Sequence, residues 1–159
     1  MTIDKIQFSG LMPALKALHL PFGKPCKSTS DNISSEDIEL LKKLIKAGDE
    51  HAKVMRGVVV WIDIKAPIYW WREMETYRFG KERLSCESTM HIQCKGLTGE
   101  TLQKVKAEMP MGKEQRAIDM YSYQCLRRIY KQRKNHRLPE WKEFCRFIET
   151  LPFSELIVL

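Results

Sequence analysis

The residues best suited to chemistry gather between His51 and His91. Three of the four tryptophans lie in this segment, interspersed with charged and hydroxyl side chains. Aromatic planes stack on a planar base, guanidinium groups bind its phosphate, and hydroxyls orient it. The candidate nucleotide- or cofactor-binding residues are Arg72, Glu73, Tyr77, Arg78, Ser85, Glu87, Ser88, Thr89 and His91. The same pattern is typical of core tryptophans beside a solvated helix face, so both interpretations stay open.

A second candidate is a basic run near the carboxyl end, LRRIYKQRKNHR, which contains no acidic residue. Such a run at a helix end can hold phosphates, and it is equally typical of a solvated surface that the helix dipole favours. The candidate phosphate or nucleic-acid contacts are Arg127, Arg128, Lys131, Arg133 and Lys134.

The spacing of the cysteines and the absence of common catalytic motifs argue against several kinds of site. The five cysteines are odd in number and include no C-x-x-C pair, which predicts free thiols in a reducing compartment and no metal site. His19 and His136 are expected at the surface or in loops rather than as ligands. The sequence has no Gly-rich phosphate loop and no H-E-x-x-H or G-x-S-x-G motif, so no catalytic residue is assigned.

Composition places these residues in an ordinary globular protein. The chain has 159 residues, 43% hydrophobic and 30% charged, which predicts a single domain over 1–159 with one core. Its 27 basic and 20 acidic residues give a formal charge of +7, which favours nucleotides or nucleic acid as partners. No secretory signal or membrane span is evident, so we expect a cytoplasmic protein without a membrane partner.

Periodicity and capping residues predict the elements that must position the candidates. A cap at Ser34 or Ser35, an apolar stripe and Gly48 define one helix, and GVVVWIDI over 57–64 is typical of a strand. Pro67 predicts a helix that ends at Gly80. The other expected elements are a helix over 10–18, a loop over 19–33, irregular structure over 81–90, an extended return over 90–94, helices over 98–108 and 113–134, and a last helix from 138 followed by a packed tail.

Together these elements predict a helix-rich α+β domain with a small antiparallel sheet built around Val58–Ile64. Asp63 falls on the polar side of that strand. The candidates from Arg72 to Arg78 then lie on the helix after the strand.

The segment from His51 to His91 resembles the flavin-dependent thymidylate synthases. Members of that family carry a His near the start of a strand, then F-x-I-x-A-P, an aromatic or apolar pair with R-Q, and the signature R-H-R-x-x-S-x-N-E-x-S-x-R-Y. The corresponding pieces here are His51, WIDIKAP at 61–67, IYWWRE at 68–73, TYR at 76–78 and SCESTMH at 85–91. The tail sequence LPFS at 151–154 is similar to a Leu-Pro-x-Ser element further along the family's chain.

The resemblance implies roles for individual residues. Residues 72–73 lie where the family has Arg-Gln, and Arg78 matches the last arginine of R-H-R, which contacts the flavin. Glu87 matches the signature glutamate, Thr89 the serine near the deoxyuridylate, and His91 the basic residue after it. The resemblance also implies FAD as the cofactor and a homo-oligomer whose sites are shared between subunits.

The sequence departs from the family pattern at several positions. Thr76 and Tyr77 stand where the first Arg and the His of R-H-R belong, and Cys86 replaces the asparagine. About three extra residues separate Arg78 from the Ser-x-Glu segment. The chain ends at Leu159, before the family's final helices with their A-Q-x-E-I-R element, which predicts a truncated member.

A closer resemblance is to a group of small proteins encoded by phages and prophages. That group carries W-W-[KR]-E-x-[DE]-T-Y-[KR]-x-G, then S-T-M-H, and a late Trp helix that ends in Leu-Pro. These elements lie here at 70–80, 88–91 and 141–152. The resemblance implies a phage origin and the host cytoplasm as the location.

Three functions are compatible with these observations. The first is a nucleotide-binding protein that keeps the fold of the family without its chemistry. The second is an active enzyme that uses FAD to methylate deoxyuridylate (dUMP). The third is a phage anti-defence protein, or an accessory factor that binds DNA or protein through the basic run at 127–137.

Overall fold

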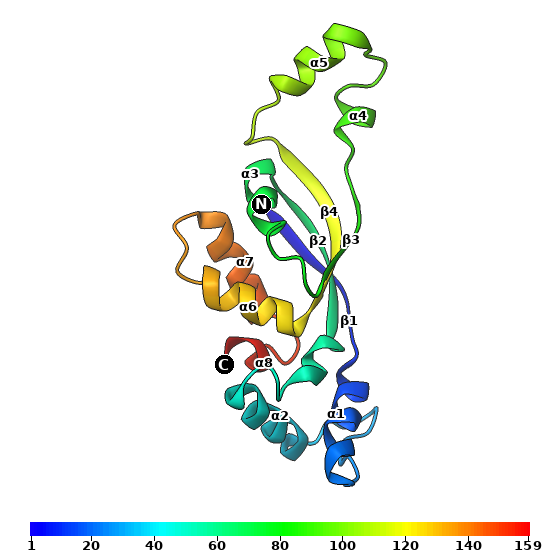
Figure 1. Cartoon of the computed structure of the whole chain (residues 1–159), viewed down its shortest axis with the longest axis vertical. Coiled ribbons are helices and arrows are strands. Elements are labelled where there is room, and N and C mark those ends of the chain that lie inside the picture. Colours follow the sequence, from blue (N-terminus) through cyan, green and yellow to red (C-terminus); the bar gives the residue numbers. More distant parts are fainter.

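A four-stranded antiparallel sheet forms the centre of the protein, in the strand order β1-β2-β4-β3 (Figure 1). The structure is a computed structural model that describes residues 1–159. Its strands are β1 (Thr2–Ser9), β2 (Val59–Pro67), β3 (Lys81–Cys86) and β4 (Glu114–Ser122). Its helices are α1 (Leu11–His19), η1 (Leu20–Phe22), α2 (Ser35–Ala47), η2 (Lys53–Arg56), α3 (Ile68–Met74), α4 (Thr89–Ile92), α5 (Gly99–Ala107), α6 (Tyr123–Arg133), α7 (Pro139–Glu149) and α8 (Glu155–Val158). The expected helix-rich α+β class with a small antiparallel sheet is confirmed.

One face of the sheet is covered by α3, α6 and α7 (Figure 1). Alternate residues of β2, among them Val60, Ile62 and Ile64, point to this face and are fully buried. The ring centroids of Trp70 and Trp141 lie 4.9 Å apart within this core. These two tryptophans therefore pack in the core, as one of the two interpretations of the sequence predicts.

The other face of the sheet has no helix over it (Figure 1). Trp61 and Asp63 of β2 lie on this face, and both are partly exposed. Asp63 forms an ion pair with Arg116 of β4, whose Nε donates to Asp63 Oδ1 at 2.8 Å. Hydrogen bonds from Arg116 lower the pKa of Asp63, although partial burial opposes the shift. The predicted polar position of Asp63 is confirmed.

A buried ionic cluster joins β3 to β4. Asp119 is completely buried, and Arg83 Nε donates to its Oδ1 at 2.8 Å. Lys81 Nζ and the Tyr121 hydroxyl donate to the other carboxylate oxygen at 3.4 Å and 3.1 Å. The Arg83 guanidinium also lies 4.4 Å from the centre of the Trp71 ring. These partners compensate for the removal of the Asp119 charge from water.

Helices α1 and α2 form one end of the elongated molecule (Figure 1). The Ser34 hydroxyl accepts a hydrogen bond from the Glu36 amide at the start of α2, and Gly48 follows the helix, so the predicted limits are confirmed. The tail packs against the same end, where Arg127 donates to the carbonyl oxygen of Leu159 at 2.6 Å. Leu156 of α8 is fully buried, which confirms the packed tail.

The loop between α1 and α2 is held by hydrogen bonds to Asp37, a residue in the first turn of α2. Asp37 Oδ2 accepts hydrogen bonds from the amide and hydroxyl of Ser28 at 2.7 Å and 2.6 Å. Burial on its own raises the pKa of Asp37, but the hydrogen bonds from Ser28, Cys26 and His19 outweigh it and lower the pKa to about 2. His19 is buried at the end of α1, so its expected surface position is wrong; it contacts Asp37 because α1 packs on α2.

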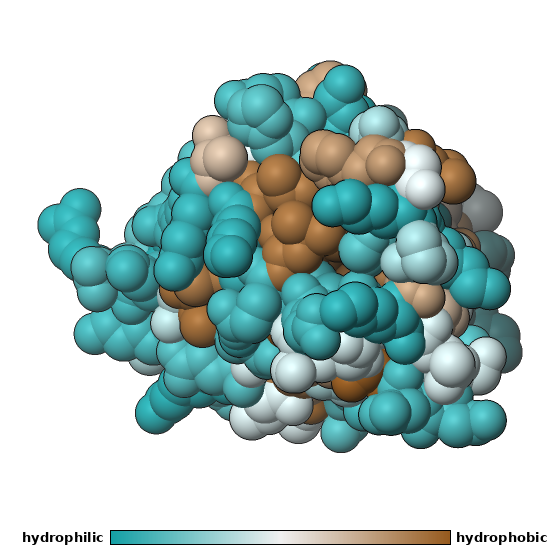
Figure 2. All heavy atoms as spheres, turned by 90° about the horizontal axis from the view of Figure 1, so that it is seen from below, coloured by the Kyte–Doolittle hydropathy of each residue, from teal (hydrophilic) through white to brown (hydrophobic).

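Viewed from this end, a group of apolar side chains lies near the middle of the surface, with hydrophilic side chains around it (Figure 2). Leu20 and Phe22 of η1 are 77% and 57% exposed.

Helices α4 and α5 stand away from the rest of the molecule, at the end opposite α1 and α2 (Figure 1). We call residues 89–107 the arm. Neither helix of the arm contains a buried residue, and the apolar side chains Leu102 and Val105 are half-buried. No helix in the structure is both long enough and apolar enough to span a membrane.

Several predicted elements differ from the structure. Residues 81–86 form an edge strand instead of irregular structure, because β4 supplies the backbone partners that its polar sequence does not reveal. Residues 114–122 form β4 instead of the first half of a long helix. The 90–94 segment is largely the short helix α4, which Ser88 caps. Helix α3 ends at Met74 rather than Gly80, where the Thr76 hydroxyl donates to the Glu73 carbonyl.

Candidate functional site

A hollow of about 560 Å³ opens where η2, the turn before β3 and the start of α6 meet. Its volume lies in the range of small-molecule sites, which is roughly 300–1,000 Å³. The lining residues are Asp49, Arg56, Phe79, Gly80, Ser122, Gln124 and Arg128. A second hollow of about 200 Å³ adjoins it and is lined by Thr76, Tyr77, Arg78, Phe79, Arg128 and Gln132. Because Phe79 and Arg128 line both, we treat the two hollows as one cleft.

Three guanidinium groups surround the cleft, and none of them forms an ion pair within the chain. Arg56 donates from Nε to Gln124 Oε1 at 3.0 Å, and Arg128 donates to the carbonyl oxygen of Phe79. The Nε of Arg128 is buried without a hydrogen-bond partner. Arg78 is exposed. Unpaired, closely placed guanidinium groups attract phosphates and carboxylates, which they can bind in a bidentate manner.

The cleft also presents an exposed aromatic ring. Phe79 is 79% exposed and lines both hollows of the cleft. Its neighbour Gly80 has φ of 79°, and a Cβ there would lie only 2.4 Å from the Ser122 hydroxyl. That hydroxyl accepts a hydrogen bond from the Cys125 amide at 3.2 Å and caps α6. The turn that carries Phe79 therefore requires glycine at position 80.

Three of the sequence candidates form a hydrogen-bonded network, and one of them, Tyr77, also lines the smaller hollow of the cleft. Glu73 Oε2 accepts hydrogen bonds from Arg133 Nη1 at 2.7 Å and from Trp141 Nε1 at 2.8 Å. Arg133 Nε donates to the Tyr77 hydroxyl at 2.8 Å, and that hydroxyl donates to Gln132 Oε1. The structure thus brings Glu73, Tyr77 and Arg133 together, where they join α3 to α6 and α7.

Ser85 and Glu87 lie beside another hollow, of about 160 Å³, at the junction of β3 and β4. Glu87 accepts a hydrogen bond from the Arg116 amide at 3.0 Å and remains exposed. Arg116 and Cys86 also line this hollow.

The remaining candidates of the 72–91 segment occupy separate places. Ser88 caps α4 through a hydrogen bond from the His91 amide, and Thr89 accepts a hydrogen bond from Lys106 within the arm. His91 is exposed on the arm, and Arg72 is exposed on α3. In one copy of the chain, Phe79 and Gly80 of the cleft directly precede β3, whereas the arm begins beyond the other end of this strand.

The basic run does not form one continuous surface. Arg127 is buried and donates to the carbonyl oxygens of Leu159 and Ile45, and burial lowers its pKa. Arg133 belongs to the network with Glu73. Among the named candidates of this run, Arg128 lines the cleft, while Lys131 and Lys134 are exposed.

Sequence reasoning did not find Arg56, Phe79 and Gln124 as parts of the cleft. They come from η2, the turn before β3 and α6, and no fixed spacing links them. An aromatic residue directly before a glycine, as in Phe79-Gly80, was the one local signal available for an exposed ring on a tight turn.

The fold is that of the flavin-dependent thymidylate synthases. ThyX from Helicobacter pylori, crystallised with FAD and dUMP, matches with a TM-score of 0.78 at 14% identity, over 99% of this chain and 98% of that chain. A second crystal structure of the H. pylori protein with FAD and dUMP gives 0.79 at 13% identity, with the same coverage of both chains. The UMP/dUMP methylase PolB from Streptomyces cacaoi, bound with 5-Br dUMP, gives 0.65 at 11% identity, over 94% and 88%.

No protein-family model and no curated protein matches the sequence. The match with the H. pylori structure extends over nearly the whole of both chains.

Proposed function

We propose that this protein binds a nucleotide-type ligand in the cleft. The observation that carries this proposal is the set of three arginines without acidic partners, Arg56, Arg78 and Arg128, around a hollow that also presents Phe79. The guanidinium groups would hold phosphate, and the phenylalanine ring would stack on the base or on a flavin ring. Asp49 is the one acidic residue among the lining residues, so the cleft favours anions.

FAD is the first ligand that we propose. The arginines and the exposed ring fit a pyrophosphate joined to planar rings, and the structural neighbours from H. pylori were crystallised with FAD and dUMP. A bound flavin would supply hydride chemistry. Within this chain, Arg78 and Arg128 would bind the phosphates, and Phe79 would position a ring. Ser85 and Glu87, beside their own hollow, would be available for a dUMP-like substrate.

We propose binding without turnover as the main activity. Thr76 and Tyr77 stand where the resemblance places two flavin-contacting side chains, and the Tyr77 hydroxyl is held between Gln132 and Arg133. Each charged hydrogen bond that is missing would weaken cofactor binding by about 1.5–3 kcal/mol. FAD-dependent methylation of dUMP is the alternative, and it requires the same cleft. The dispersed basic run does not favour nucleic acid as the ligand.

We also propose a homo-oligomer that forms through the arm. Helix α5 presents Leu102 and Val105 without a buried residue of its own, so a second copy would cover this apolar surface. The family resemblance implies sites that are shared between subunits, and in such an assembly Thr89 and His91 of one copy would contribute to the cleft of another. A phage origin and the host cytoplasm remain proposals that rest on the W-W-R-E-x-E-T-Y-R-x-G pattern at 70–80.

The test is to identify what the purified protein carries. Its visible absorption spectrum reports bound flavin, and mass spectrometry identifies small molecules released by heat. We expect FAD or a nucleotide, or, if the protein is empty, saturable binding of added FAD or dUMP. Formation of dTMP in an assay with reduced nicotinamide cofactor and methylenetetrahydrofolate would establish the enzyme instead of the binding protein. A protein that carries no ligand and binds neither compound would overturn the proposal.

A further inference from the structure

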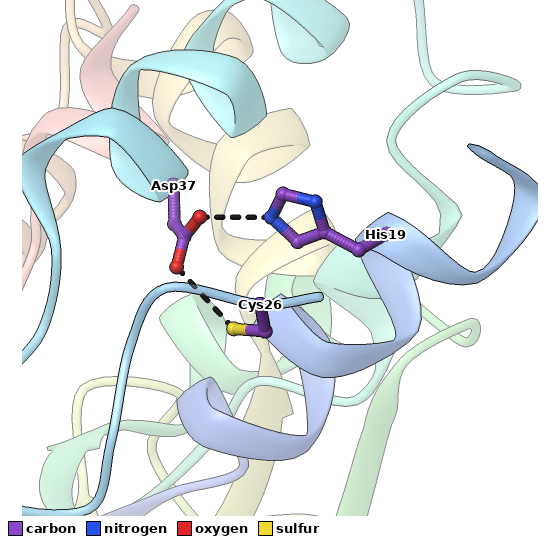
Figure 3. Close-up of side chains that lie close together, drawn as sticks. All are labelled: His19, Cys26 and Asp37. Carbon is purple, nitrogen blue, oxygen red and sulfur yellow. Dashed lines mark hydrogen bonds and ion pairs between the residues drawn. The ribbon is translucent and has the colours of Figure 1, made fainter. Parts of the chain in front are cut away.

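Three side chains capable of ligating a metal meet between α1 and α2, and none of them lines the cleft (Figure 3). His19 is the last residue of α1, Cys26 lies in the following loop, and Asp37 is in the first turn of α2. One ligand atom from each residue lies within 4.8 Å of the other two. His19 Nε2 is 2.8 Å from Asp37 Oδ1, and Cys26 Sγ donates to Asp37 Oδ2 at 3.3 Å.

The Asp37 carboxylate at the centre of this group has no lysine or arginine partner. Its side chain is 1% exposed, and its donors are His19, Cys26 and the amide and hydroxyl of Ser28. The neighbouring Lys27 pairs with Glu36 instead. Buried carboxylates are normally paired with a cation or coordinate a metal. A divalent cation between the three side chains would place a fixed positive charge beside this buried carboxylate.

We propose that His19, Cys26 and Asp37 form a binding site for a divalent transition metal, with Zn²⁺ as the best match. Thiolate, imidazole and carboxylate are all zinc ligands, whereas Ca²⁺ and Mg²⁺ prefer oxygen alone. Zinc sites of this type use three protein ligands and leave a fourth position to water. Cys26 is the partly exposed member of the group and provides the route from solvent.

Two of the three pairs of ligand atoms are already close to the spacing that a tetrahedral cation requires. Zn–N and Zn–O bonds of about 2.0–2.1 Å in tetrahedral geometry place the two ligand atoms about 3.3–3.4 Å apart. His19 Nε2 and Asp37 Oδ1 are now 2.8 Å apart, so they must separate by roughly half an ångström. The corresponding change between Cys26 Sγ and Asp37 Oδ2 is smaller still, because these atoms are already 3.3 Å apart.

Binding of the cation releases one proton from the protein. The Cys26 thiol loses its proton to the buffer and binds the metal as a thiolate. With a neutral imidazole, the His19 proton moves from Nε2 to Nδ1, an atom that is buried and now has no hydrogen-bond partner. One proton therefore leaves for each cation bound. The bound metal would join the end of α1, the loop and the start of α2.

Cobalt is the probe that reports the proposed bond directly. Reduced full-length protein, freed of metal with a chelator, is titrated with Co²⁺ and then with Zn²⁺. A thiolate-to-cobalt charge-transfer band should saturate at one equivalent, and Zn²⁺ should abolish it. Cys26→Ser should remove the band, and His19→Gln should weaken metal binding at least tenfold. The control Cys86→Ser, which alters an exposed cysteine outside the group, should leave the band and the metal affinity unchanged.

Two results would overturn the proposal. The first is no thiolate band with excess cobalt while circular dichroism shows a folded protein. The second is a band that persists in Cys26→Ser, because the sulfur would then come from another cysteine. The outcome is independent of the proposed nucleotide function, since none of the three ligands lines the cleft.

Discussion

Replacing Gly80 with alanine should destabilise the protein for two reasons. The new Cβ would lie 2.4 Å from the Ser122 hydroxyl, and an L residue would also have to adopt φ near 79°. The left-handed backbone costs about 1–2 kcal/mol. Displacing Ser122 from its cap on α6 costs about 1 kcal/mol more. We therefore expect a loss of about 2–3 kcal/mol in the free energy of unfolding.

A matched glycine separates these two effects. Gly96 has φ of 76°, and no atom lies within 4 Å of the Cβ position there. Gly96→Ala should therefore show the backbone cost alone. Urea unfolding of both variants measures the difference. Ser122→Ala should lower the free energy of unfolding less in the Gly80→Ala background than in the wild type, because it also removes the oxygen that clashes with the new Cβ. Equal losses in Gly80→Ala and Gly96→Ala would refute the contact argument.

Three further predictions concern the core, the thiols and the arm. Asp119→Asn should cost about 3 kcal/mol in urea unfolding, because it removes the buried carboxylate that Lys81 and Arg83 share and leaves them only the exposed Glu75; Asp63→Asn at the partly exposed pair should cost about 1 kcal/mol or less, and similar losses would contradict the buried cluster. Burial raises the pKa of Cys145 to about 11, so native alkylation followed by mass spectrometry should label the exposed Cys86 first, and labelling of Cys145 should increase as the pH rises towards 11; equal rates at pH 8 would contradict its burial. Light scattering should give an oligomer for the wild type and a smaller mass for Leu102→Asp, and a monomeric wild type would count against the arm as an interface.

Elements with strong local signals could be predicted from the sequence. The cap at Ser34 and the stop at Gly48 defined α2, and a β-branched run defined β2. The inward face of α7 was also predictable, because Trp141 and Phe144 are buried at helical spacing. The motif resemblance around residues 61–91 indicated the fold that the structure shows.

Elements whose stability comes from distant partners could not be predicted. Asp119 makes β4 look like part of a polar helix, because its charge is neutralised only when Lys81 and Arg83 arrive on β3. The hydrogen bond from Arg133 to the Tyr77 hydroxyl joins residues more than fifty positions apart, so the spacing in the sequence could not reveal it. The cleft could not be predicted for the same reason, because Arg56 approaches the start of α6 only in the folded chain.

Equilibrium binding to arginine variants tests the central claim most directly. FAD and dUMP are titrated separately into wild-type protein, Arg56→Gln, Arg78→Gln and the control Arg137→Gln, which changes an exposed arginine that does not line the cleft. Each lost guanidinium contact is worth about 1.5–3 kcal/mol, so the Kd of the bound compound should rise about 10- to 150-fold in the two cleft variants. The control should bind as the wild type does. Unchanged affinity in both cleft variants would contradict the assignment of the cleft as the nucleotide site.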